Sequence, residues 1–378
     1  MNNSGLAEPS VLRREAAEAA VDARASLRCE VMRPSALGPS ETDTWRRMIE
    51  ATPALRRAFL TPSFALACER ATRRAWIAVL HDSGGLRGFL PFQFSSFWRQ
   101  TVGLADPIGG SLSDATGLVA WPGFRVDPAS LLRLAGLASL FVSHLVPGQE
   151  AFGLRPEGYR TGHVTELSGG ASAYWDALRQ RDRALVRDTE RCLRKAEKTF
   201  GALRFTTMDR IPFSMIEQLI VEKREQYRRT HVPDGFADGR NLRVIAAMNE
   251  APSSECQLTL SRLEAGGHVL AQHLGARHHD VLSYWFPVYN VGMRNISPGR
   301  LLLWHMIGRA DEDGITLIDY GEGDALYKRE LATAATQYGR AAWSSGGPRG
   351  LLARCCQSVV WRMQTRRRTL LQTVSRQV

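Results

Sequence analysis

The sequence predicts an α/β protein built as two similar halves, each with a mixed central sheet flanked by helices. Helical and strand-like patterns alternate along the chain, and one order of elements occurs twice: helices, a meander of strands, a helix and a closing strand. The 378 residues, 44% of them hydrophobic, are enough for two domains with buried cores. We expect the halves to span residues 28–168 and 169–345, between a polar extension over residues 1–27 and a basic tail over residues 346–378.

The first half is predicted to begin with a strand and two helices, followed by a β-hairpin. Glu41 and Asp43 favour a helix start near Ser40, because acidic side chains stabilise the first turn of a helix. Pro62 must restart the second helical region. The expected elements are strand 27–33, helical regions 40–52 and 53–71, hairpin strands 75–80 and 86–94, short strands 98–103 and 117–120, helix 128–140, and strands 141–146 and 163–167.

The second half is predicted to open with one long helix and to contain a three-stranded meander. In that first helix, arginine and lysine are mixed with acidic residues. Two interpretations stay open for it: a solvated face of ion pairs, or a basic rim that steers an anionic ligand. The expected elements are helix 170–200, strand 203–207, helices 212–229 and 238–248, meander strands 256–264, 268–277 and 281–287, helix 300–312, and strand 315–320.

A helix start at Ser297-Pro298-Gly299 follows the last strand of the meander. Ser297 can cap this helix, and Pro298 suits its first turn, where a missing N–H is not needed. Unpaired amides and the positive end of the helix dipole make such a start a natural seat for phosphate, and Arg294 and Arg300 bracket it. The turn is therefore either a pyrophosphate site or an ordinary capped helix start between two strands.

Short motifs in both halves resemble those of one bacterial acetyltransferase family. They are Tyr284-Trp285, Pro287, Tyr289, Ser297-Pro298-Gly299, Leu301-Leu302, Asp319, Gly323-Asp324 and Tyr327-Lys328 in the second half, and Pro62-Ser63-Phe64, Gly88-Phe89-Leu90-Pro91-Phe92, Pro107-Ile108-Gly109-Gly110 and Leu112-Ser113-Asp114 in the first. With these motifs the chain resembles the CelD-type family, named for cellulose biosynthesis, within the GNAT superfamily and close in fold to the Fem-type aminoacyltransferases. The resemblance extends from Cys29 to Trp343 and implies two tandem GNAT-like halves.

The resemblance also implies acyl-coenzyme A, in the simplest case acetyl-coenzyme A, as a co-substrate bound in the second half only. GNAT enzymes bind the coenzyme A pyrophosphate with a loop of the form Gln/Arg-x-x-Gly-x-Gly/Ala. Residues 294–299 have this frame, with a serine in place of the first glycine. The residues expected to bind the co-substrate are Tyr284, Arg294, Ser297, Gly299, Arg300 and Lys328.

Acyl transfer needs a polarised thioester oxygen, a base for the acceptor and an acid for the leaving thiolate. The resemblance assigns the oxygen to a backbone N–H of the strand Tyr284–Pro287. His273 suits the role of base by its ordinary pKa, and Asp324 suits it by its position in the family. Each also has a purely structural interpretation, as a hydrogen-bonded strand histidine and as the cap of the following helix. Tyr289 or Tyr327 is expected to protonate the thiolate.

Several kinds of site and location are not expected. The six cysteines form no Cys-x-x-Cys pair and have no nearby histidine at ligand spacing, so we expect reduced thiols and no metal site. The sequence has no phosphate-binding loop, no dinucleotide fingerprint and no Gly-x-Ser-x-Gly elbow. It also lacks an apolar signal core at its N-terminus and an apolar run long enough to span a bilayer, so we expect a cytoplasmic protein.

The positive charge is concentrated in the tail. Residues 346–378 contain seven arginines and no acidic residue, which accounts for +7 of the net charge of +11. The body is therefore only mildly basic, and nucleic acid is not an expected partner. A basic amphipathic helix in the tail can lie on the inner face of the membrane, join a polysaccharide synthase complex, or pack on the body with its arginines outward.

Together these features predict a GNAT-family acyltransferase that moves an acyl group, in the simplest case acetyl, from acyl-coenzyme A. The expected acceptor is an amine or hydroxyl of a small molecule, a sugar, or a cell-envelope or exopolysaccharide precursor. Direct transfer is expected, because no activated nucleophile stands out. Two alternatives remain: a Fem-like transferase that uses aminoacyl-tRNA on a peptidoglycan precursor, and a non-catalytic accessory protein of a polysaccharide synthase complex.

Overall fold

The computed structural model describes residues 27–323, 325–348, 350 and 353. Over these residues the chain forms a 13-stranded mixed sheet that runs through both halves, with helices on its faces. The strand order is β1-β2-β3-β4-β6-β13-β7-β12-β11-β10-β9-β8, and β5 pairs with β3 off this path. The predicted α/β class, with a mixed sheet flanked by helices, is confirmed.

The first half contains the strands from β1 to β6. Its strands are β1 (Arg28–Met32), β2 (Ala75–Asp82), β3 (Gly85–Gln93), β4 (Leu104–Pro107), β5 (Val119–Ala120) and β6 (Ser139–Leu145). Its helices are α2 (Pro39–Glu50), α3 (Pro62–Thr72), α4 (Phe97–Val102) and α5 (Pro128–Leu134). β2 and β3 form the predicted hairpin, whereas β4 runs parallel to β6.

The second half contains the predicted antiparallel meander and the helices that cover it. Its strands are β8 (Leu203–Met208), β9 (Gln257–Ala265), β10 (His268–His278), β11 (Val281–Tyr289) and β12 (Leu317–Glu322). Its helices are α6 (Gly170–Arg181), α7 (Arg183–Phe200), α8 (Phe213–Arg229), α9 (Arg240–Glu250), α10 (Pro298–Gly308), α11 (Ala310–Asp313) and α12 (Leu326–Leu331). β11 runs parallel to β12, as β4 does to β6 in the first half.

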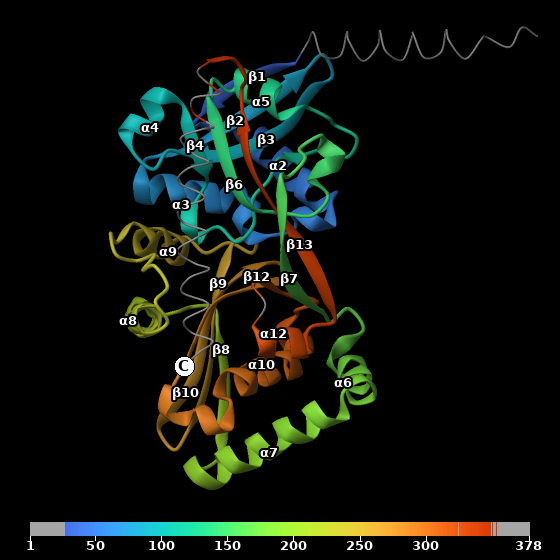
Figure 1. Ribbon diagram of the computed structural model, residues 1–378, viewed down its shortest axis with the longest axis vertical. Helices are drawn as coiled ribbons and strands as arrows, with labels where there is room; N and C mark the ends of the chain where they lie inside the picture. Colours follow the sequence, from blue (N-terminus) through green and yellow to red (C-terminus); the bar gives the residue numbers. More distant parts are fainter. Residues whose placement is uncertain (1–26, 324, 349, 351–352, 354–378) are drawn as a thin grey trace, which may run out of the picture.

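The two halves exchange one strand each. β13 (Ala334–Ser344), the last strand of the second half, pairs with β6 of the first half and with β7. β7 (Gly158–Glu166), the last strand of the first half, pairs with β12 of the second. In Figure 1 both strands run from one half into the other. A buried ion pair joins the halves at this junction, because Arg57 Nε lies 2.7 Å from Asp319 Oδ2.

Each parallel strand pair separates partway along its length. The β4–β6 pairing ends at Ala105 and Leu140, and the β11–β12 pairing ends at Ser283 and Asp319, although all four strands continue. The strands diverge beyond these residues, and their unpaired backbone groups face the gap. The fold therefore builds two such splayed strand pairs, one in each half.

Three predicted elements differ from the structure. Residues 98–103, predicted as a strand, belong to helix α4, whose start is capped by Ser96 Oγ accepting from the Arg99 N–H at 3.3 Å. The predicted helix 128–140 ends at Leu134, and β6 takes its last residues. The predicted helix 170–200 is broken at Asp182, because the Asp182 side chain accepts the Leu185 N–H at 2.9 Å and starts α7.

Some predictions fall outside the described residues. These are the extension over residues 1–26, the catalytic candidate Asp324 and the basic tail from residue 354. In the described part of the chain no helix is both long enough and apolar enough to cross a bilayer.

Candidate functional site

The start of α10 differs in detail from a side-chain-capped helix. Ser297 has a left-handed backbone (φ 52°), and its side chain makes no capping hydrogen bond, so the predicted cap is wrong. Its carbonyl instead accepts the N–H groups of Arg300 (2.9 Å) and Leu301 (3.1 Å). Within the described residues this leaves the Gly299 N–H as the first-turn amide without a backbone acceptor.

The two arginines beside this turn have different roles. Arg294 lies exposed on the 3₁₀ segment before the helix, and its guanidinium makes no ion pair with the rest of the described chain. The Arg300 side chain points inward: it pairs with Asp188 on α7 and lies 3.8 Å from Glu330 on α12. Arg300 thus holds three helices together, and Arg294 is the arginine that is free to meet a ligand.

His273 and Tyr284 lie stacked at the base of the splay between β11 and β12. Their rings are 4.2 Å apart with an interplanar angle of 11°. The Trp285 N–H donates to His273 Nε2 at 3.0 Å, so Nδ1 carries the ring hydrogen, and this buried atom has no partner among the described residues. Burial, together with the charges of Lys223 and Lys328, lowers the pKa of His273 to about 3. His273 is therefore neutral at physiological pH and a weak base.

Three tyrosines fill the space above His273. The ring of Tyr284 lies edge-on to Tyr320 at 5.6 Å and to Tyr327 at 6.5 Å. Burial raises the pKa of all three phenols above the ordinary value, so each keeps its proton. Tyr289 lies farther along β11, with Cδ1 3.9 Å from the position that a Cβ at Gly299 would take. Two predicted acids, Tyr289 and Tyr327, are thus placed along the splay.

Two lysines, Lys223 buried and Lys328 half-buried, bind the backbone of the two splayed strands. Lys223 of α8 donates to the Pro287 carbonyl of β11 at 2.9 Å, and Lys328 of α12 donates to the Tyr320 carbonyl of β12 at 2.7 Å. Burial and the charge of Lys328 lower the pKa of Lys223 to about 8, and burial also lowers the pKa of Lys328. An ammonium whose pKa lies near neutrality can both stabilise negative charge and give up a proton.

Acidic groups face these lysines across the junction between the halves. Asp114, from the first half, has its pKa raised by burial, against the opposing charges of His144 and Lys328. His144 Nε2 lies 3.9 Å from Asp114 Oδ1 and 3.7 Å from Glu322 Oε2. A carboxyl with a raised pKa is suited to accept and release a proton near neutral pH.

The cavity next to this cluster lies between the two halves, although the sequence predicted a ligand site in the second half only. Most of its lining comes from the first half, where β4 and β6 diverge, and the rest from the second half. It measures about 520 Å³, and α9 and the segment before it close one side. Five arginines line it, some of them paired with acidic neighbours: Arg74, Arg99, Arg160, Arg240 and Arg340. Among the residues of the cluster, His144 lines the cavity and connects it to Asp114, while Lys223 and Lys328 do not line it.

The structure therefore brings His273, Tyr284, Tyr327 and Lys328 together, while Arg294, Ser297 and Gly299 form a separate group at the start of α10. Sequence reasoning missed Lys223, Asp114, His144 and Glu322. Lys223 does leave a signal in the sequence, because it continues the apolar stripe of Ile216, Leu219 and Ile220 on α8. A lysine is rarely buried at such a core position unless its ammonium group is paired.

Comparison with known proteins identifies the domain around this cluster. Residues 183–329, from the start of α7 into α12, match the sequence model of the family described as "Acetyltransferase (GNAT) domain". No curated protein matches the sequence. Among solved structures, the chain is similar to a conserved protein of unknown function from Bacteroides thetaiotaomicron VPI-5482, at 13% identity and a TM-score of 0.49, over 82% of this chain and 98% of that one.

Two further structures have lower TM-scores. A tandem GNAT protein from the clavulanic acid biosynthesis pathway gives 12% identity and a TM-score of 0.46, over 85% of this chain and 99% of that one. FemX gives 12% identity and a TM-score of 0.43, over 85% of this chain and 98% of that one. Similarity at this level transfers no substrate or activity.

Proposed function

We propose that the GNAT-type acetyltransferase domain formed by residues 183–329 transfers an acyl group, in the simplest case acetyl, from acyl-coenzyme A. One observation carries this proposal: the ammonium groups of Lys223 and Lys328 lie on carbonyls of the two splayed strands, with the Asp114 carboxyl close enough to act on the charge of both. An acyl thioester between β11 and β12 would have positive charge beside its oxygen and a base facing its carbonyl carbon.

The roles of the groups follow from their charges. As the acceptor nitrogen or oxygen attacks the thioester carbon, negative charge develops on the carbonyl oxygen, and the ammonium groups stabilise it. This contribution matters because the Trp285 N–H is already bound to His273. Asp114 takes the proton from the acceptor. When the carbon–sulfur bond breaks, Lys223 supplies a proton to the leaving thiolate, which conserves protons over the reaction.

The pyrophosphate of coenzyme A is proposed to bind at the start of α10. The Gly299 N–H and the Arg294 guanidinium are the free donors there, and the helix dipole favours negative charge at the same place. Substitution at Gly299 meets no steric obstacle, since the nearest atom to an added Cβ lies at 3.9 Å. An aspartate at that position therefore tests the charge without disturbing the packing.

The acceptor is proposed to enter through the arginine-lined cavity. Guanidinium groups bind phosphate well, so a phosphate-linked sugar would suit this lining better than a neutral sugar. An exopolysaccharide or cell-envelope precursor of this kind agrees with the resemblance to the CelD-type family. The proposal thus has the donor entering at the start of α10 and the acceptor through the arginine-lined cavity, and the two meet at the Lys223–Asp114 cluster.

A thermal-shift panel of acyl-coenzyme A species tests the donor assignment. Linkage predicts that wild-type protein gains about 2.7 kcal/mol at a hundredfold excess over Kd. Arg294→Glu and Gly299→Asp should lose most of this gain, while Arg229→Glu, an exposed control on α8, should keep it. No gain for wild type with any acyl-coenzyme A would refute the donor and favour the accessory role.

A tRNA filter-binding measurement distinguishes the Fem-like alternative from the acyl-coenzyme A proposal. That alternative requires binding of aminoacyl-tRNA with a steep dependence on salt concentration. The acyl-coenzyme A proposal instead expects free coenzyme A thiol to appear in the presence of a phosphorylated aminosugar acceptor.

A further inference from the structure

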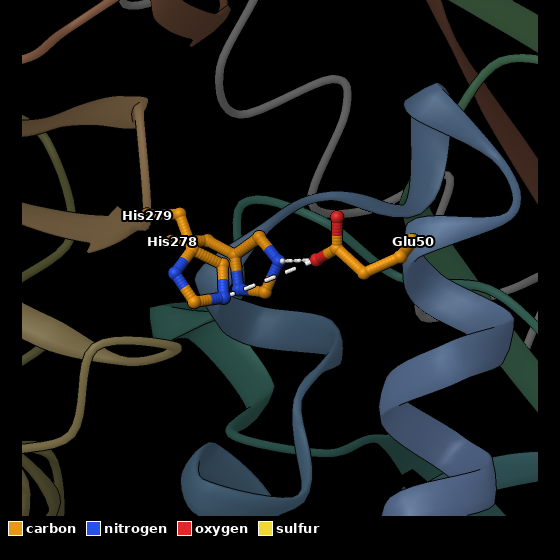
Figure 2. Close-up of side chains that lie close together, drawn as sticks. All are labelled: Glu50, His278 and His279. Atoms are coloured by element: carbon orange, nitrogen blue, oxygen red, sulfur yellow. Dashed lines mark hydrogen bonds and ion pairs between the residues drawn. The ribbon is translucent and has the colours of Figure 1, made fainter.

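A glutamate and two histidines from different halves meet beside the turn between β10 and β11. Glu50 is the last residue of α2, and His278 and His279 lie at the end of β10 and in the turn that follows it. Figure 2 shows both imidazole rings directed at the same Glu50 carboxylate. His278 Nε2 lies 3.0 Å and His279 Nε2 3.9 Å from Glu50 Oε1. One ligand atom from each residue lies within 4.8 Å of the other two.

The hydrogen bond on the other side of the His278 ring fixes its tautomer. His278 Nδ1 lies 2.9 Å from the backbone carbonyl of Glu255, and a carbonyl oxygen only accepts, so Nδ1 must carry hydrogen. The lone pair of neutral His278 at Nε2 then points at a carboxylate oxygen. Two acceptors at 3.0 Å need a cation between them: a proton that makes the ring an imidazolium, or a metal ion.

The surrounding geometry favours a metal ion. An imidazole that donates one N–H to a carbonyl while its other nitrogen faces the ion is the usual arrangement of a metal-binding histidine. Zinc–ligand bonds of roughly 2.0–2.1 Å in tetrahedral geometry place ligand atoms about 3.3 Å apart, between the two measured separations. A proton on His278 accounts for that contact alone, whereas a metal ion would also take the His279 ring, which packs edge-on to His278 at 4.6 Å, as a ligand.

The turn at His279 sets where its ring lies. This residue has a left-handed conformation (φ 49°), which histidine adopts more often than most residues other than glycine. Its N–H donates to the Ser254 carbonyl at 2.9 Å, which holds the turn in place. The result is that an exposed ring, with no other hydrogen-bonding partner in the described chain, stands beside the same carboxylate.

The charges around the three residues are compatible with one divalent ion. Arg56 Nε lies 3.2 Å from the second oxygen of Glu50, and the Arg56 guanidinium also pairs with Asp280. Arg56 and Asp280 offset each other, so the ion would face one carboxylate and two neutral imidazoles. This set of nitrogen and oxygen ligands suits Zn²⁺ and Co²⁺ better than Mg²⁺ or Ca²⁺.

We propose that Glu50, His278 and His279 form a site for a divalent ion of the zinc class that ties the first half of the molecule to the second. The sequence predicted no metal site, because a metal site is recognisable in a sequence only when its ligands lie close together in the chain. Glu50 and His278 are 228 positions apart. The proposed metal site lies where the β11–β12 pairing begins, and the lysine cluster lies where this pairing ends. The metal ion would therefore hold the two halves together and would take no part in acyl transfer.

Cobalt titration of the chelator-treated full-length protein tests the site. Co²⁺ should bind one equivalent with a visible d–d spectrum of four-coordinate type and without a thiolate charge-transfer band. Zn²⁺ should compete for it and raise the melting temperature. Glu50→Gln and His279→Asn should each weaken Co²⁺ binding at least tenfold, in keeping with the loss of one ligand of three.

The control for His279→Asn is His231→Asn, because His231 is also exposed with a left-handed backbone (φ 54°). It should bind Co²⁺ as wild type does. Circular dichroism of each variant confirms folding without metal. The proposal is overturned if Co²⁺ does not bind, if binding is unchanged in Glu50→Gln and His279→Asn, or if a thiolate band shows that cysteines hold the ion.

Discussion

Lys223 is the residue whose chemistry depends most on its surroundings. It lies on an apolar helix face, its ammonium donates to the Pro287 carbonyl, and a second ammonium, Lys328, lies close enough to lower its pKa. Asp114 opposes this shift. The balance puts the pKa of Lys223 at about 8, so a small change of pH within the physiological range changes its charge.

Acyl transfer should therefore slow as the pH rises through about 8. The proposed role requires protonated Lys223, which is lost above its folded pKa, so kcat/KM of wild type should fall there. Lys223→Met should be slower at pH 7, by 10²–10⁴-fold as is common for general acids, with no fall near pH 8. A pH–rate profile of coenzyme A release measures both effects. A wild-type profile that rises through pH 8 would contradict the assignment.

The free energy of unfolding gives an independent readout of the pKa of Lys223. Between pH 8 and the unfolded value of 10.5, the unfolded chain binds the Lys223 proton and the folded chain does not. Stability from this group therefore increases with pH in that window, by at most about 1.4 kcal/mol per pH unit. Denaturant unfolding at pH 8 and 9.5 should show this increase in wild type and not in Lys223→Met, whether or not the residue acts in catalysis.

At the scale of elements, an irregularity in β10 places His273. The β10–β11 register shifts between Leu274 and Ala276, and the shift lets the His273 ring reach the Trp285 N–H on β11. Gly275 lies in this irregularity. A Cβ at Gly275 would come within 2.6 Å of His273 Cε1 and 2.8 Å of Leu282 Cδ1, which is closer than real contacts allow. The glycine is required because the histidine ring folds back over it.

Gly275→Ala should accordingly destabilise the protein and release the Trp285 N–H. Crowding of this kind typically costs about 1–3 kcal/mol, measurable by denaturant unfolding. The tryptophan amide should also lose protection from hydrogen exchange relative to its neighbours on β11. The matched control is Gly267→Ala: Gly267 is a turn glycine with open space around it, so only its positive φ opposes the change. If Gly275→Ala is as stable as wild type, the position of the His273 ring does not depend on a glycine at residue 275.

Element type was predictable wherever burial follows the local pattern. The meander, α8, and the strands on either side of α10 agree with the sequence, because α8 buries one apolar stripe and β10 and β11 are continuous buried runs. Residues 98–103 were mispredicted because Phe97 and Trp98 are apolar yet 72% and 76% exposed, so their hydrophobicity does not report a buried strand. The break at Asp182 was missed because a capping aspartate between two helices has the same composition as a charged helix face.

At the scale of the whole molecule, the candidate site depends on contacts that the sequence does not reveal. Lys328 was predicted because it belongs to the Tyr327-Lys328 motif, and His273 because the ordinary pKa of histidine suits a base. Asp114 was missed because it reaches that half only after β7 and β13 cross between the halves. The pattern of residues in a strand shows whether the strand is buried but not which strand lies beside it. The exchange of β7 and β13 between the halves therefore could not be deduced from periodicity.

The exchange makes each half depend on the other for folding. Without residues 169–378, β6 and β7 lose β13, which lies between them. Without residues 1–168, β12 and β13 lose β7, and the buried Asp319 carboxylate loses the Arg57 guanidinium, a loss that costs roughly 3–5 kcal/mol in comparable pairs. Two fragments cut after residue 168 should therefore each fail to fold.

Separate expression of residues 1–168 and 169–378, followed by co-expression, measures this dependence. Each fragment alone should show no cooperative thermal transition by circular dichroism, because exposed strand edges and an unpaired buried charge remain. Co-expressed fragments should purify together and melt in one transition, since β13 can still enter between β6 and β7. A fragment that melts cooperatively alone would mean that its half closes its own sheet, and the crossing strands would then not be what holds Asp114 against Lys223.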